Sequence, residues 1–153
     1  MSTTRVSRRI RASRAAVYRA LLDPDAVARW RFPTGMTPTV HEFDARAGGR
    51  FRVSLTYDAP TDTGKTSAQT DTYHGHFDEL VPDEKVVEVL AFETDAPEHQ
   101  GVMTMTTTLA DAGDGTDILV VHEGIPVGVA PADNELGTRL ALDHLAALVE
   151  AGA

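Results

Sequence analysis

Two histidines are the first side chains whose types and spacing could do chemistry. His74 and His76 stand two residues apart, so on a strand their imidazoles would share one face and could offer two ligands to a metal ion. A metal site also needs a third ligand, and the neighbouring sequence offers none. The histidines alternate with Tyr73 and Phe77, which predicts that both imidazoles face solvent. The sequence therefore predicts no metal site.

His122 is a second candidate, next to Glu123 at the end of the last predicted strand. An imidazole titrates near neutral pH, so beside an apolar pocket it could act as a general acid or base. Alternatively, it bonds a backbone carbonyl and holds the loop at 124–130. The chain has no P-loop, no G-x-S-x-G elbow, no H-E-x-x-H helix and no dinucleotide-binding glycine motif. We therefore expect no cofactor and favour a protein that is not an enzyme. If the protein is an enzyme, His122 is the candidate catalytic residue.

Composition excludes several classes of function. A net charge of −9 argues against a general nucleic-acid binder, since phosphate contacts need a basic surface. The absence of cysteine excludes disulfides and thiolate sites. There is no signal-peptide pattern and no run of about 20 apolar residues that could span a membrane. We expect a single domain, 1–153, in a cytoplasmic protein with no nucleic-acid or membrane partner.

A predicted helix at 131–150 is the element against which the others must pack. Its start suits Pro131, because the first helical turn does not need the missing N–H. One apolar stripe at about 100° per residue consists of Thr138, Ala141, Leu142, Leu145 and Val149. Leu136, Leu140 and Ala147 lie on nearly the opposite side. The helix therefore needs two neighbours: a sheet, and a loop, a second helix or another subunit.

Alternation of apolar and polar residues predicts seven strands, at 5–11, 40–44, 51–57, 70–80, 86–92, 102–109 and 116–123. Ser13 and Asp23-Pro24 cap two short helices after the first strand, and the second helix ends near Trp30. The residues at 34–38 predict a turn, and those at 58–69 a mobile hairpin loop. Hairpin-like turns join the last six strands, which indicates an antiparallel meander.

These elements predict an α+β helix-grip fold: a curved antiparallel β-sheet wrapped around the long C-terminal helix, with the two short helices closing one end. Such a fold need not fill its middle, so a gap between sheet and helix is a natural site for an apolar ligand. Arg8 interrupts the inner row of the first strand, between Val6 and Ile10. We expect it to pair with a carboxylate rather than with an anionic ligand.

Several motifs, in this order along the chain, resemble a known family. They are RRIRAS at 8–13, VYRAL at 17–21, DP at 23–24, WRFP at 30–33, GGRFR at 48–52, GHFDELVPDEKVV at 75–87 and HEGIP at 122–126. Together they are similar to the START-like, or Bet v 1-like, helix-grip superfamily (SRPBCC), in its branch related to the activator of Hsp90 ATPase. That superfamily includes hydrophobic-ligand carriers, polyketide cyclases and chaperone regulators, so the resemblance leaves function open.

One departure from the family pattern affects the expected pocket. Relatives commonly carry a Gly-Trp pair on the C-terminal helix, where this chain has Gly137-Thr138. Replacing the large aromatic side chain with threonine should leave the gap wider or more polar. The predicted ligand-binding residues are Trp30, Phe51, Val53, Leu55, Tyr57, Tyr73, Met103, Met105, Thr138, Leu142 and Leu145.

Three functions compete at this point. The favoured one is binding of a small apolar or aromatic molecule between sheet and helix, without covalent chemistry. An alternative is a cyclase- or hydratase-type enzyme, with His122, Tyr73 or Arg8 in acid–base or anion-holding roles. The third is a protein-interaction module, such as a regulator of the Hsp90 ATPase, for which Leu136 and Leu140 could form a partner surface. The same two leucines could instead support a homodimer.

Overall fold

The elements follow the predicted order along the chain. The computed structural model describes residues 1–59 and 69–151, so most of the loop predicted at 58–69 lies outside them. Within these residues the elements are β1 (Ser2–Ile10), α1 (Arg14–Leu22), α2 (Pro24–Trp30), β2 (Met36–Phe43), β3 (Arg50–Tyr57), β4 (Thr70–Val81), β5 (Lys85–Phe92), a 3₁₀ turn (Pro97–His99), β6 (Met103–Ala112), β7 (Gly115–Ile125) and α3 (Pro131–Ala151). Among the described residues, no helix has both the length and the apolar character needed to cross a membrane.

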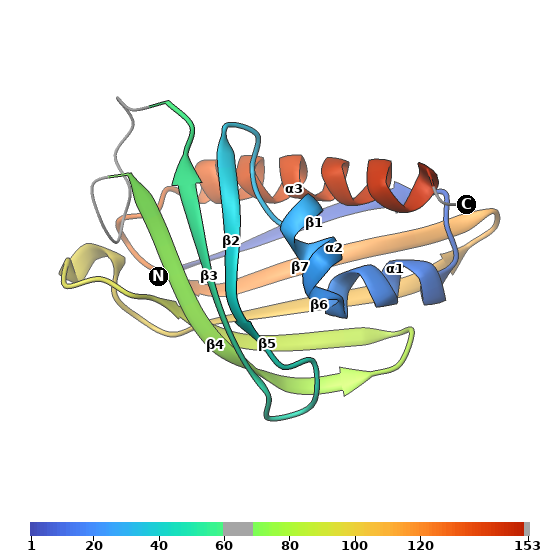
Figure 1. Ribbon diagram of the computed structural model, residues 1–153, viewed down its shortest axis with the longest axis horizontal. Coiled ribbons are helices and arrows are strands. Elements are labelled where there is room, and N and C mark those ends of the chain that lie inside the picture. Colours follow the sequence, from blue (N-terminus) through green and yellow to red (C-terminus); the bar gives the residue numbers. More distant parts are fainter. Residues whose placement is uncertain (60–68, 152–153) are drawn as a thin grey trace.

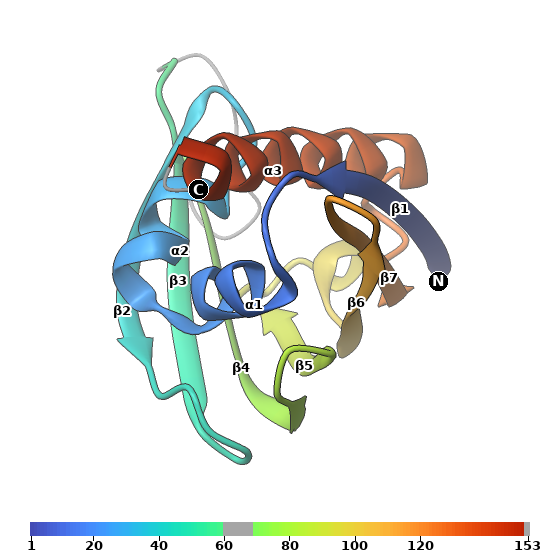
Figure 2. The same cartoon turned by 90° about the vertical axis from the view of Figure 1, so that its right-hand side faces the viewer.

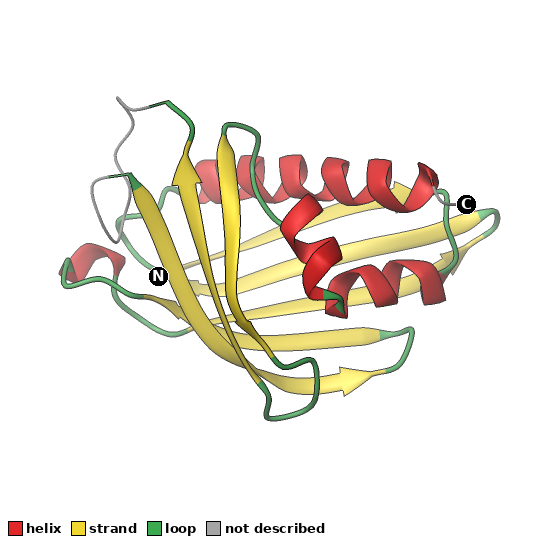
Figure 3. Ribbon diagram, in the orientation of Figure 1, coloured by secondary structure: helices red, strands yellow, loops and turns green. Residues whose placement is uncertain are grey.

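The strands form one antiparallel sheet in the order β1-β7-β6-β5-β4-β3-β2. Strands β2 to β7 make the predicted meander, and β1 pairs with β7 at the far edge. The sheet curves around α3, and α1 and α2 cover one end of its concave face (Figures 1 and 2). The three α-helices of the described residues lie on this face, and Figure 3 shows their separation from the strands. The α+β helix-grip fold is therefore confirmed.

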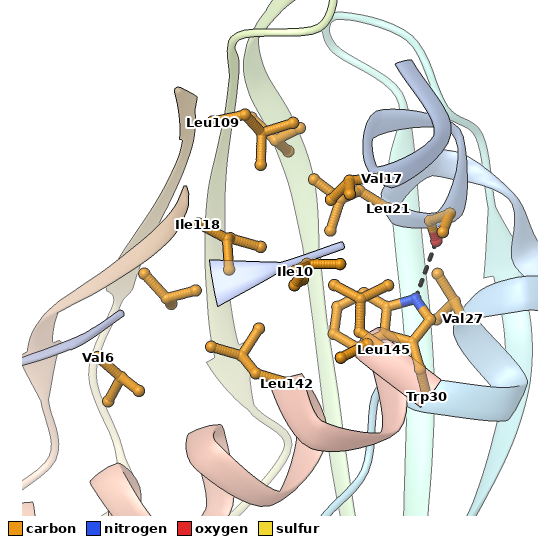
Figure 4. Packing of buried hydrophobic residues seen from close by; sticks show 14 of the residues in the cluster. Val6, Ile10, Val17, Leu21, Val27, Trp30, Leu109, Ile118, Leu142 and Leu145 are labelled. Atoms are coloured by element: carbon orange, nitrogen blue, oxygen red, sulfur yellow. Dashed lines mark hydrogen bonds between the residues drawn. The ribbon is translucent and has the colours of Figure 1, made fainter. Parts of the chain in front are cut away.

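The two short helices begin where their capping residues predict. The Ser13 hydroxyl accepts a hydrogen bond from the first turn of α1, and the Asp23 carboxylate does the same for α2, where Pro24 is the first residue. Trp30 ends α2, and its indole N–H donates to the carbonyl of Ala20 at 2.9 Å (Figure 4). This bond joins the two helices and satisfies the polar atom of a buried tryptophan.

The packed core lies under the C-terminal half of α3. Leu142 and Leu145 point from this half towards Ile10 of β1, Ile118 of β7 and Trp30 of α2 (Figure 4). The buried residues of α3 are Leu142, Leu145 and Ala146, all beyond its midpoint. The N-terminal half of the helix therefore faces something other than a dense core.

Arg8 pairs with a carboxylate, as predicted. Its Nε lies 2.8 Å from Oδ1 of Asp143 on α3, while Val6 and Ile10 on either side are buried. A third of the Arg8 side chain stays exposed (34%). The pair thus ties β1 to α3 near the surface.

Strand β2 begins four residues earlier than its predicted start at residue 40 and includes part of the predicted turn. It is an edge strand that pairs only with β3 in the described sheet. Such a strand tolerates Pro38, because one side of its backbone needs no ladder hydrogen bond. The earlier start places Met36 inside the molecule, where only 6% of the residue is exposed.

Candidate ligand-binding cavity

A cavity of about 500 Å³ lies between the inner face of the sheet and the N-terminal half of α3. Its wall is formed by the end of α2 and the loop after it, by inner residues of β3 to β7, by the loop before α3 and by α3 residues from 133 to 142. Small-molecule pockets in proteins commonly span about 300–1,000 Å³. The gap expected from the curved sheet therefore has the size of a ligand site.

The structure brings most of the predicted site residues to this wall. Those that line the cavity are Trp30, Leu55, Tyr57, Tyr73, Met103, Met105, His122, Thr138 and Leu142. Phe51, Val53 and Leu145 lie instead in the packed core, with exposed fractions of 1%, 1% and 0%.

These three differences have a geometric cause. Alternation identifies the face of the sheet on which a side chain lies, but it does not show where along a strand the packed core ends. On β3, Phe51 and Val53 fall within the core, whereas Leu55 and Tyr57 reach the cavity. Leu145 lies in the half of α3 that covers the core.

Arg31 is the most consequential cavity residue that the sequence pattern did not identify. It lies directly after α2 with 12% of its side chain exposed, and its guanidinium contacts Glu88 Oε1 of β5 at 2.5 Å. The guanidinium carbon also lies over the rings of Tyr73 and Phe51, at 5.4 Å and 5.7 Å from their centres. Burial alone would lower the pKa of Arg31, but the charge of Glu88 and its hydrogen bond raise that pKa above its ordinary value.

One signal in the sequence could have pointed to this ion pair. Glu88 occupies an inner position of an otherwise apolar run, between Val86 and Leu90. A carboxylate on the buried face of a strand needs a partner, because an isolated buried charge is very costly. The pattern implies a buried base somewhere, but only the fold identifies it as Arg31.

His122 is held in the cavity wall by a side chain of α3. Its Nδ1 lies 3.3 Å from the Asn134 amide nitrogen, while Oδ1 of the same amide accepts a 2.6 Å hydrogen bond from the Thr4 hydroxyl. In this arrangement the amide donates to Nδ1, so the neutral imidazole carries its proton on Nε2. Burial, and then the charge of Arg31, lower the pKa of His122 to about 4. The imidazole is therefore neutral at physiological pH.

Two polar atoms on the cavity residues are buried without a partner. The Tyr73 hydroxyl and His122 Nε2 have no hydrogen bond to any residue from 1–59 or 69–151. Burial raises the pKa of Tyr73, with Arg31 acting in the opposite direction, so its hydroxyl stays protonated. Both atoms are consequently available as donors.

The loop after α2 forms a further part of the wall and is fixed to α3 by His144. The Nδ1 of His144 bonds the Phe32 carbonyl at 2.9 Å, and its Nε2 lies 3.1 Å from the Thr34 hydroxyl. The imidazole also stacks on the Phe32 ring, with the centroids 4.6 Å apart. This loop therefore packs against α3.

Leu136 and Leu140, the suggested partner surface, also belong to the wall of the cavity. Leu136 is 56% exposed, whereas Leu140 is half-buried. These leucines therefore lie where the cavity meets the surface. Their position in the cavity wall accounts for their apolar character without an unoccupied partner surface on α3.

His74 and His76 face solvent, as predicted from their alternation with Tyr73 and Phe77. His74 lies 3.1 Å from Glu93, and His76 lies 3.9 Å from Asp78. In the described parts of the chain, no group of three or more histidine, aspartate or glutamate side chains is placed to hold a metal ion. The two imidazoles thus take part in surface contacts away from the cavity.

Solved structures of similar shape cover nearly the whole chain. A protein from Chromobacterium violaceum is 39% identical, with 97% of this chain and 96% of that chain covered and a TM-score of 0.87. An AHSA1 protein from Silicibacter pomeroyi has a TM-score of 0.81 at 14% identity, with 99% of this chain and 100% of that chain covered. An AHSA1-like protein from Aeromonas hydrophila has a TM-score of 0.74 at 19% identity, covering 99% and 94%. The last two similarities concern the fold alone.

The family model for activator of Hsp90 ATPase homolog 1-like proteins matches residues 11–150. Among curated proteins, none matches this chain. The matched range includes α1, α2, all strands from β2 to β7 and almost all of α3. The family resemblance of the sequence motifs is thereby confirmed. This chain belongs to the family of activator of Hsp90 ATPase homolog 1-like proteins.

Proposed function

We propose that this protein binds a small apolar or aromatic molecule in the cavity between the sheet and α3, without covalent chemistry. The observation that carries the proposal is the cavity of about 500 Å³ between Met105 on the sheet and Leu142 on the helix, where a dense core would have argued against it. Two methionines on β6 suit a permissive site, because their flexible side chains adapt to varied apolar shapes.

The enzyme alternative has less support. Arg8, one of its three candidate residues, is paired with Asp143 at the surface and is not part of the cavity wall as described. His122 lines the cavity, but its pKa of about 4 makes it a weak base at neutral pH. General acid–base catalysis is most efficient when the pKa lies near the operating pH. Binding without chemistry is the simpler function for this wall.

The interaction alternative, whether with a chaperone or with a second copy of the chain, would use Leu136 and Leu140. Both residues line the cavity, so a bound small molecule would contact the surface that a protein partner needs. This overlap favours the ligand over the partner. A homodimer formed through these leucines would dissociate in the variant Leu140→Glu, and sedimentation of the wild-type protein as a monomer would exclude it.

The binding proposal predicts that filling the cavity from α3 weakens the binding of a neutral apolar probe. N-phenyl-1-naphthylamine should bind the wild-type protein with one-to-one stoichiometry and increased fluorescence. Thr138→Trp restores the bulky residue common in relatives and should lower probe affinity about 10-fold or more, since overpacking costs about 1–3 kcal/mol. Fluorescence titration measures both affinities.

Arg139→Trp is the matched control for this prediction. It introduces the same side chain at the next residue of the same helix, on an exposed position away from the cavity wall. Its probe affinity should equal that of the wild-type protein. Equal binding by all three proteins, or no saturable binding by the wild-type protein, would refute the proposed function.

A further inference from the structure

Tyr73, His122 and Arg31 are polar residues of a largely apolar cavity wall. Arg31 pairs with the buried Glu88, and its charge acts on both Tyr73 and His122. Glu88 and His122 each pair with Met105 from the strand between them, which places the two residues in one row across β5, β6 and β7. Tyr73 lies under the Arg31 guanidinium, 5.4 Å from its ring centre. Arg31 and its partner Glu88 thus connect Tyr73 and His122, which both line the cavity.

The Tyr73 hydroxyl and His122 Nε2 are unusual because both are buried without a hydrogen-bond partner among the described residues. Leaving a buried polar group without a hydrogen bond costs about 1–3 kcal/mol, and most buried polar groups are paired. Tyr73 and His122 both line the cavity, yet their hydroxyl and Nε2 find no partner in the described residues. A ligand with a suitable polar atom would remove this cost.

The protonation states of Tyr73 and His122 determine which kind of polar ligand atom they can bind. The Thr4–Asn134–His122 chain of contacts leaves the imidazole proton on Nε2, so this nitrogen donates. The Tyr73 hydroxyl is also protonated and can donate. A carbonyl oxygen carries two lone pairs and can accept from both. The site therefore favours an acceptor oxygen over a donor group.

The charges in the wall indicate that the ligand is neutral. Arg31 is the basic side chain of the described wall, and Glu88 already neutralises it. Asp71 and Asp133 add two carboxylate residues to the same wall. A ligand anion would have to compete with Glu88 for the guanidinium and lose its own hydration, which makes burial of a second negative charge unfavourable.

We propose that the cavity recognises a neutral, largely apolar molecule through one carbonyl oxygen, which accepts hydrogen bonds from the Tyr73 hydroxyl and the His122 Nε2–H. The proposal rests on the proposed function, because it requires that the cavity be a ligand site. It adds the chemical class of the ligand and the orientation in which it enters, with the carbonyl group at Tyr73 and His122 and the hydrocarbon against β6 and α3.

Three probes of one size test the proposal: 2-acetylnaphthalene, 2-ethylnaphthalene and 2-naphthoate. Their dissociation constants are measured by displacement of N-phenyl-1-naphthylamine from the wild-type protein and from Tyr73→Phe, His122→Phe and Tyr18→Phe. The ketone should bind wild-type protein most tightly. Tyr73→Phe and His122→Phe should each weaken ketone binding about 3- to 10-fold, the value of one hydrogen bond, while the hydrocarbon binds unchanged or more tightly.

Tyr18→Phe is the matched control, since it removes a tyrosine hydroxyl from α1, outside the cavity wall, and should change no affinity. Tyr73→Phe removes an atom without a protein partner, so this variant should fold, and circular dichroism checks that it does. Infrared spectroscopy of the bound ketone gives a direct signal: the carbonyl stretch should move to higher frequency in Tyr73→Phe as the hydrogen bond is lost.

The outcomes separate the two proposals. Loss of ketone selectivity in either variant, with hydrocarbon binding retained, supports the carbonyl site. Equal binding of ketone and hydrocarbon by wild-type protein, or tighter binding of 2-naphthoate than of the ketone, overturns the carbonyl site and leaves the apolar binding function in place. If none of the probes binds, both proposals fail.

Discussion

At the scale of single residues, the surroundings of the polar side chains in the cavity wall determine their protonation states. His122 illustrates this point, because an exposed imidazole would titrate near pH 6.5 whereas burial and the nearby Arg31 charge lower its pKa to about 4. Its Nε2 is covered, although the residue as a whole is only partly buried. The neutral donor form thus persists well below neutral pH.

This pKa shift predicts an acid-sensitive contribution to stability. Between about pH 6.5 and pH 4 the unfolded chain takes up a proton at His122 and the folded protein does not, so stability is lost as the pH falls. Between about pH 7 and pH 5, the free energy of unfolding should fall by about 1–2 kcal/mol more in wild-type protein than in His122→Gln. Urea denaturation at both pH values measures this difference. An equal decrease in the two proteins would show that His122 titrates normally when folded.

At the scale of elements, α3 has two halves with different tasks. Its C-terminal half buries Leu142, Leu145 and Ala146 in the core, and its N-terminal half forms one wall of the cavity. Gly137 lies in this second half, within the helix. Among the described residues, a Cβ added there would meet only Pro33, at 3.9 Å, which is ordinary van der Waals contact. Nothing close to Gly137 in the structure therefore requires a glycine.

Replacement of this glycine should stabilise the helix. Gly137→Ala is expected to raise the free energy of unfolding by about 0.5–1 kcal/mol, because glycine lowers helix stability by that amount relative to alanine. Gly75→Ala on β4 is the contrasting variant, since its Cβ would lie 2.0 Å from the Val89 carbonyl oxygen and should destabilise the fold. Thermal and urea denaturation distinguish the two. A loss of stability in Gly137→Ala would mean that the cavity wall cannot accept even a methyl group.

At the scale of the whole molecule, one buried ion pair joins the layer of short helices to the sheet. Arg31 follows α2, and Glu88 lies in the middle of the sheet on β5, with exposed side-chain fractions of 12% and 3%. A buried pair of this kind adds little net stability over apolar residues of the same size, but removing one partner leaves an uncompensated charge. The pair also sets the electrostatics of the cavity.

A double-mutant cycle tests this account. Arg31→Met should destabilise the protein by about 3–5 kcal/mol, because Glu88 is left buried and unpaired. Adding Glu88→Leu to the same chain should restore most of that loss, to within about 1 kcal/mol of the wild-type value. Urea denaturation of the single and double variants gives the coupling energy. Additive losses in the double variant would instead indicate that the packing of the two side chains matters more than their charges.

The sequence by itself determined the elements, the fold and the family. Capping at Ser13 and Asp23 and the apolar stripe of α3 are local signals, so they could be interpreted without knowing the neighbours of each segment. Arg8 could be expected to find a carboxylate, because a charge in an inner row needs a partner. The boundary of β2 was wrong, since edge position, which the sequence does not reveal, decides whether Pro38 is tolerated.

Only the tertiary structure decided where the core ends and the cavity begins. Phe51 and Leu55 share one face of β3 and look equivalent in the sequence, yet one lies in the core and the other lines the cavity. Arg31 and Glu88 are 57 residues apart, so no local pattern could pair them. The position of the free Tyr73 hydroxyl likewise depends on the curvature of the sheet relative to α3. Cavities and buried polar networks arise from the distances between elements, and these distances are fixed only when all the elements pack together.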